Sequence, residues 1–268
     1  MIQMSAGIGM RAALRRLGSI PGWVVGVWLT QVALAAGVGA IVKTTVAAAM
    51  AGDHIEPGGR WLYALADLGL DHPAIAAAAA AAIGVSAVAG LLAWTLVVGL
   101  LLARLRSNAS TGAVLQTWWK TLPGIGAQSA WHVVMRGVML LAALSTASAL
   151  PPVAGWPLVW LVWSIGVVGL DVARTRVVDG APPLHPRTAA LAIVDVVRHP
   201  ARYGPAVALA AIGTLVPLVL VWLGLSQLGG ALAPTGARAV ALAGVALGLW
   251  RLALVVLRTD ASVRAADD

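Results

Sequence analysis

Six long apolar stretches, and the positions of the basic residues between them, constrain this chain more than any other feature. A helix needs about 20 mostly apolar residues to cross the hydrocarbon core of a bilayer. The stretches that meet this need are Trp23–Val42, Ala74–Ala103, Trp131–Leu150, Trp156–Ala173, Tyr203–Ser226 and Ala239–Leu257. Threaded in order, they leave all but three of the 18 Lys and Arg residues on one side, the exceptions being Lys43, Arg60 and Arg238. Because Lys and Arg concentrate in cytoplasmic loops, we expect both termini to be cytoplasmic.

Composition agrees with a membrane protein. Hydrophobic residues make up 60% of the chain and charged residues 10%, whereas charged residues form about 25% of an ordinary soluble protein. A length of 268 residues suits one compact bundle and leaves no room for a sizeable soluble domain as well. We therefore predict an all-α fold: a single membrane domain over residues 1–268, forming a polytopic bundle of six transmembrane helices in a bacterial cytoplasmic (inner) membrane.

Two further segments have the pattern of short helices that lie in the headgroup region. One is external, at residues 53–72, and the other is cytoplasmic, at residues 187–199, where four prolines set it apart from its neighbours. The cytoplasmic segment places Leu191, Val194 and Val197 on one side and Asp195 and Arg198 on the other. Apolar and charged residues on opposite faces are typical of an interfacial helix.

Three charged residues fall inside the predicted spans, at similar depth near the cytoplasmic end: Arg136, Asp171 and Arg251. Charges within a membrane are costly, so each is a candidate functional residue. In one interpretation Asp171 orients one arginine while the other binds an anionic headgroup or lipid phosphate. In the other, which we favour, both arginines reach to the interface and Asp171 pairs locally with Arg174.

The sequence predicts no catalytic residue and no cofactor. Phosphate-binding, metalloprotease and nucleophile-elbow motifs are absent, and so is cysteine, which excludes disulfides and thiolate metal sites. Candidate metal ligands are restricted to the external loop, at His54, Glu56 and His72, whose spacing is that of an ordinary solvated loop. His132 lies near a span, but a membrane haem would need a second histidine at matching depth.

The central third of the chain resembles a known group of proteins. This part consists of the segment Gly169-Leu170-Asp171-Val172-Ala173-Arg174, the amphipathic stretch up to Arg198-His199-Pro200 and the span after it. This central third resembles uncharacterised bacterial membrane proteins with six transmembrane helices, whose fourth helix ends in Asp-x-Ala-Arg before a short cytoplasmic helix. The cytoplasmic helix here lacks the aromatic residue that such proteins often carry. The resemblance implies the topology and no activity.

These observations favour a non-enzymatic, permease-like or scaffolding subunit of a membrane complex. The alternative is an anionic-lipid-binding or lipid-handling protein that uses Arg136, Asp171 and Arg251. A third hypothesis, an electron-transfer membrane anchor, would require a partner ligand for His132. We expect anionic lipid headgroups and membrane-protein subunits as partners. Nucleic acid is not expected, because the net charge of +8 comes from short loops flanking apolar helices.

Overall fold

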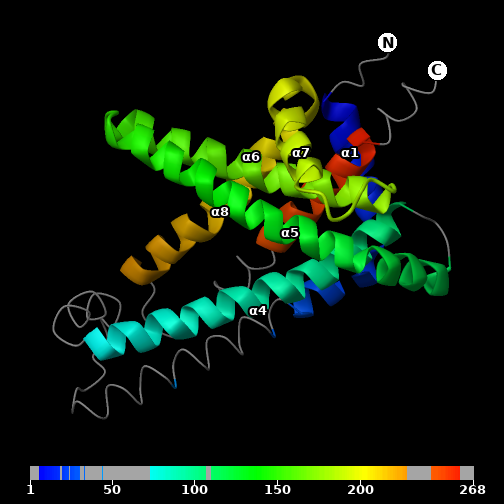
Figure 1. Ribbon diagram of the computed structural model, residues 1–268, viewed down its shortest axis with the longest axis horizontal. Coiled ribbons are helices and arrows are strands. Elements are labelled where there is room, and N and C mark those ends of the chain that lie inside the picture. The colour runs from blue at the N-terminus through cyan, green and yellow to red at the C-terminus, as the bar shows by residue number, and fades with distance from the viewer. Residues whose placement is uncertain are drawn as a thin grey trace. The chain divides into compact units, whose positions relative to one another are not determined.

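The computed structural model describes residues 6–18, 20–23, 25–30, 33, 44, 73–106, 110–227 and 243–259. Regular structure in this part of the chain is entirely α-helical. Figure 1 shows the labelled helices, which are α1 (Ala6–Gly18), α4 (Pro73–Arg106), α5 (Thr111–Ser148), α6 (Pro152–Val178), α7 (Pro186–Arg198) and α8 (Pro200–Gln227). A further helical segment covers residues 243–259. The predicted all-α class is therefore confirmed for the described residues, while the external segment 53–72 lies outside them.

The chain divides into two compact units. One contains Met1–Trp28 and Thr95–Asp268, and the other contains Leu29–Trp94. The division falls inside α4, so that its residues from Thr95 onward belong to the larger unit together with α5 to α8. Within the larger unit α6 packs against α5, α7 and α8, and most extensively against α5.

Helices α5 and α6 form an antiparallel hairpin. Residues 149–151 connect them, and Pro152 already occupies the first turn of α6, where its missing N–H is not needed. At 1.5 Å per residue, the 38 residues of α5 extend about 57 Å and the 27 residues of α6 about 40 Å. Both exceed the roughly 30 Å of a hydrocarbon core.

Glycines on α6 set the register of the hairpin. A Cβ added to Gly155 would lie 2.9 Å from the carbonyl oxygen of Ala147, and one added to Gly166 would lie 2.7 Å from Cγ of Arg136. The distance at Gly155 means that the two backbones approach closely there, as in membrane helices that pack through small residues. The distance at Gly166 means that the Arg136 side chain occupies the space where a larger residue would have its own side chain. By contrast, no described atom lies within 4 Å of a Cβ built on either glycine of the sequence motif Gly244-x-x-x-Gly248.

The end of α6 determines how the chain enters α7. Gly180, with φ of 93°, follows the helix, and its N–H donates to the carbonyl of Val177 while that of Ala181 donates to Arg176. This pair of bonds is a Schellman motif, which glycine favours because it lacks a Cβ. Helix α7 then begins after His185, whose Nδ1 accepts from the N–H of Arg187. The structure thus confirms a separate helix where the sequence predicts residues 187–199.

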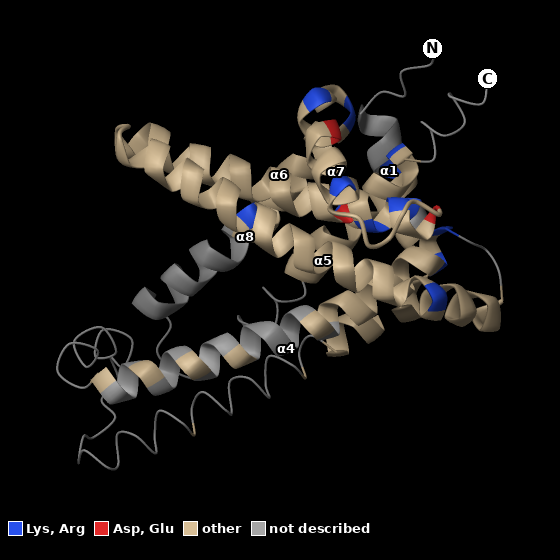
Figure 2. Cartoon of the chain, viewed as in Figure 1, with Lys and Arg blue, Asp and Glu red and all other residues tan. Residues whose placement is uncertain are grey.

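Among the residues that the structure describes, two helices, α5 and α6, are long and apolar enough to cross a membrane. In the most apolar 18-residue window of each, only 11% of α5 and 33% of α6 is buried, whereas the core helix of a soluble protein is mostly buried. Figure 2 shows charged residues gathered around α7 and the adjoining end of α6, and few along the rest of the hairpin. The two helices therefore have the length and surface expected in lipid.

The described helices extend beyond several predicted spans. The predicted span begins at Trp131, but helix α5 begins at Thr111 and continues through Pro123. Its first turns are helical but too polar to be recognised in the sequence as part of a membrane span. Helix α6 likewise exceeds Trp156–Ala173 at both ends. Most of the predicted first span, Trp23–Val42, lies outside the described residues.

Replacing Gly155 with alanine should destabilise the hairpin, because the new methyl would meet the backbone oxygen of Ala147. We expect a loss of roughly 1–3 kcal/mol in the free energy of unfolding, as is usual for overpacking. The matched control is Gly137→Ala on α5, where a Cβ would meet no described atom. That variant should be neutral or gain up to about 1 kcal/mol from helix propensity. Equal effects of the two variants in detergent unfolding would contradict the register.

Candidate functional site

An ion pair joins α6 to the segment 243–259. Nε of Arg251 donates to Oδ2 of Asp171 at 2.7 Å, and the Asp171 side chain is only 3% exposed. The sequence singled out both residues but favoured Arg174 as the partner of Asp171. That expectation was wrong, because the packing of α6 against the later helix brings Arg251 to the carboxylate instead.

Arg174 bridges three helices without a carboxylate. It is 1% exposed, and its Nε and Nη2 donate to Oγ of Ser129 on α5 at 3.2 and 2.8 Å. Nη2 also donates to Oγ1 of Thr95 in the last part of α4, at 3.4 Å. Hydroxyl groups on two neighbouring helices therefore solvate a guanidinium that is completely enclosed.

Arg136 lies between α5 and α6, close to the ion pair. Its Cζ is 3.9 Å from the ring centroid of Trp163, a cation–π geometry. It interacts electrostatically with both Asp171 and Arg251. The structure thus brings the three predicted residues Arg136, Asp171 and Arg251 into one region of the larger unit. Nothing in this arrangement contains a nucleophile with an activating base.

His132 is enclosed one turn before Arg136 on the same helix. Its Nδ1 is 3.1 Å from the carbonyl oxygen of Gln128 and therefore donates to it, while Nε2 has no hydrogen-bond partner among the described residues. A Cβ on Gly169 of α6 would lie 3.5 Å from that Nε2. The side chain is 0% exposed. Because the backbone of α6 closes this side of the imidazole, the geometry does not favour a haem ligand here.

The connection between α6 and α7 is held to α5 by side-chain donors. Nε2 of Gln128 donates to the carbonyl oxygens of Pro183 and His185, at 2.7 and 3.2 Å. Nε1 of Trp131 donates to the carbonyl of Leu184 at 3.2 Å. The carbonyls of this proline-rich connection are thereby satisfied by α5, which fixes the direction of α7.

A second charged cluster surrounds Asp195 of α7. Its Oδ2 accepts from Nη2 of Arg176 at 2.8 Å and from the hydroxyl of Tyr203 at 2.9 Å, while Oδ1 lies 2.8 Å from Nδ1 of His199. Arg176 is on α6 and Tyr203 on α8, so one carboxylate joins three helices.

A third pair links the end of α4 to the turn after α6. Arg106 donates to the carboxylate of Asp179 and, at 3.3 Å, to the hydroxyl of Thr259. Burial raises the pKa of Asp179, and the charge of Arg106 opposes this increase. The bonds therefore tie α4 and the segment 243–259 to the Schellman turn that ends α6.

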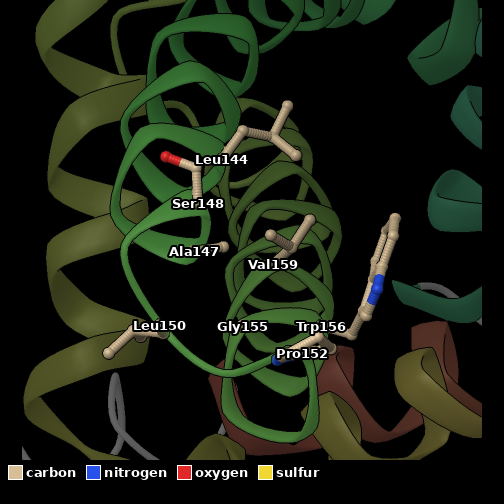
Figure 3. Close-up of a pocket in the computed structure, with 8 residues that line it drawn as sticks. All are labelled: Leu144, Ala147, Ser148, Leu150, Pro152, Gly155, Trp156 and Val159. Carbon is tan, nitrogen blue, oxygen red and sulfur yellow. The ribbon is translucent and has the colours of Figure 1, made fainter.

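An apolar cavity of about 330 Å³ opens at the turn of the hairpin, lined by Leu144, Ala147, Ser148, Leu150, Pro152, Gly155, Trp156 and Val159 (Figure 3). The hydroxyl of Ser148 donates to the carbonyl of Ser145 at 2.7 Å, so it is already engaged within α5. The cavity thus offers shape and apolar surface, and its lining hydroxyl has no free donor because its hydrogen is used within α5.

The candidate metal ligands His54, Glu56 and His72 lie outside the described residues. Within the described part, no group of three His, Asp or Glu residues could hold a metal ion. Sequence reasoning missed the roles of Arg174, Ser129 and Thr95. The available signal was the pair of hydroxyl residues in otherwise apolar helices, but no spacing rule connects residues on different helices.

The Asp171–Arg251 pair should behave as a coupled unit. Asp171→Leu or Arg251→Leu alone leaves one buried charge unpaired and should lower the free energy of unfolding by roughly 3–5 kcal/mol. The double variant should recover much of that loss, because the two leucines remove both charges. Unfolding in detergent, followed by tryptophan fluorescence, measures all three. Losses that simply add in the double variant would contradict the pair.

No family model, curated protein or solved structure matches the chain, so its site is defined by its own geometry.

Proposed function

We propose that this chain is a multi-pass protein of a bacterial cytoplasmic membrane, acting as a non-enzymatic, permease-like or scaffolding subunit of a membrane complex. The proposal includes six spans with both termini in the cytoplasm. The observation that carries it is the use of charge within the apolar helices. Asp171, Arg251 and Arg174 all connect one helix to another. Groups committed to such contacts maintain a fixed arrangement of helices rather than perform chemistry.

The outer surface of α5 supports a partner-facing or lipid-facing role. Val134, Val138 and Leu141 follow one another at helical spacing, and each is more than half exposed. In water, a continuous stripe of large apolar side chains would be unfavourable. In a membrane the same stripe faces lipid tails or a neighbouring helix without cost, which suits a subunit that assembles laterally.

Helix α7 supports the predicted cytoplasmic interface. Its packed face consists of Thr188, Ala189, Ala192 and Val196, whereas Leu191 and Val194 are exposed. Arg187 and Arg198 are also exposed and lie at the same helical spacing as Leu191 and Val194. The sequence pattern places Arg198 opposite these aliphatic residues, and that expectation was wrong, because residues seven positions apart share a helix face. An outward face that combines aliphatic and basic side chains suits the boundary between acyl chains and anionic headgroups.

The topology can be tested with single cysteines, because the natural chain has none. We expect Ala149→Cys, in the hairpin turn, to react with a membrane-impermeant maleimide on intact spheroplasts. Leu184→Cys, in the α6–α7 connection and 66% exposed, should react only after the membrane is permeabilised. Reaction of both cysteines, or of Leu184→Cys alone, before permeabilisation would overturn the proposed orientation.

The subunit role predicts a heteromeric mass. Native mass spectrometry of the chain, extracted from its own host in mild detergent, should reproducibly show it bound to at least one other membrane protein. As a matched sample, the same protein overproduced alone should lack that mass. If the host material contains only free protomer or homo-oligomer, the subunit proposal fails.

A further inference from the structure

Arg136 is placed so that its side chain must run along α6. A Cβ on Gly166 would lie 2.7 Å from Cγ and 3.1 Å from Cδ of Arg136. Any larger residue at position 166 would therefore displace the arginine. The absence of a side chain at Gly166 leaves a groove on the α6 surface, and the aliphatic part of the Arg136 side chain fills this groove.

The guanidinium of Arg136 has no hydrogen-bond acceptor among the described residues. Its Nε and Nη2 are enclosed and unpartnered, while the ring of Trp163 covers one of its faces. An aromatic face attracts a cation but accepts no hydrogen bond in the plane of the guanidinium. The residue as a whole is only half-buried, and Trp163 is 37% exposed. The site therefore borders the surface of the hairpin, although Nε and Nη2 are themselves enclosed and become accessible to an anion only when the side chain of Arg136 or Trp163 moves.

Positive charge exceeds negative charge around Asp171 in the larger unit. Among the described residues, three guanidiniums, on Arg136, Arg174 and Arg251, surround one carboxylate, that of Asp171. Arg251 occupies that carboxylate, and Arg174 is bound by hydroxyl groups. Of these three arginines, Arg136 is the one whose guanidinium has no hydrogen-bond partner among the described residues. Unpaired positive charge in apolar surroundings is unfavourable, and an anion would relieve it.

We propose that Arg136, with Trp163 and Gly166, forms a binding site for a phosphate group at the surface of the α5–α6 hairpin. A guanidinium presents parallel N–H groups that match phosphate oxygens. The phosphate comes either from an anionic lipid headgroup or from soluble phosphate. The inference goes beyond the proposed subunit role, because it concerns a ligand of the isolated chain and does not require a partner protein.

The test uses the full-length protein in detergent, with native mass spectrometry to measure retention of phosphatidylglycerol against phosphatidylcholine with the same acyl chains. Arg136→Gln should weaken phosphatidylglycerol binding by roughly tenfold or more, the usual effect of losing a charge-assisted hydrogen bond. Arg11→Gln on α1 is the matched control, since it removes the same charge from an exposed position. It should change binding less than about twofold, as expected of an exposed charge.

Gly166→Ala provides a second variant that retains every charge. The added methyl group would displace the Arg136 side chain from the groove at Gly166. Gly166→Ala should therefore also weaken phosphatidylglycerol binding, whereas Arg11→Gln should not. Thermal stabilisation by inorganic phosphate distinguishes the two sources. A shift seen in the wild type and lost in Arg136→Gln, without any lipid preference, assigns the site to soluble phosphate. If Arg136→Gln and Gly166→Ala retain both phosphatidylglycerol and inorganic phosphate as the wild type does, the site does not exist.

Discussion

A guanidinium enclosed in an apolar bundle requires acceptors supplied by the protein itself, and Arg174 depends on this constraint more than any other described residue. Its acceptors are hydroxyls on two other helices, Thr95 and Ser129. Those contacts require α4, α5 and α6 to meet at one level. Because α6 also packs against α7 and α8, the position of Arg174 helps to set the arrangement of the whole larger unit.

The C-terminal half of α6 thus gathers three kinds of polar contact along one helix. Asp171 pairs with Arg251, Arg174 is bound by hydroxyls, and Arg176 reaches Asp195. The other half of α6 approaches α5 through glycine instead, as at Gly155. Close backbone packing at the turn and directional hydrogen bonds at the opposite end therefore complement each other. The first brings the helices together, and the second fixes which groups face one another.

Much of the local structure could be predicted from the sequence, whereas the ion pair between Asp171 and Arg251 could not. Apolar length predicts α5 and α6 as helices, and flanking prolines predict the limits of α7, because both signals are local. Asp171 and Arg251 could be named as costly charges for the same reason. Their pairing depends on how α6 packs against a helix much later in the chain. The spacing of residues along the sequence does not indicate which distant helices pack together. Gly166 was likewise unremarkable until its contact with Arg136 was known.

The separation of Asp171 and Arg251 along the chain also affects the order in which contacts can form during synthesis. The two residues are 80 positions apart, so at 5–20 residues per second a ribosome adds Arg251 about 4–16 s after Asp171. The turn of the hairpin, by contrast, connects residues made within a second or two of each other. Contacts near the turn are available to form first, and the ion pair is necessarily late. During synthesis, the carboxylate of Asp171 therefore exists for several seconds before the guanidinium that pairs with it has been made.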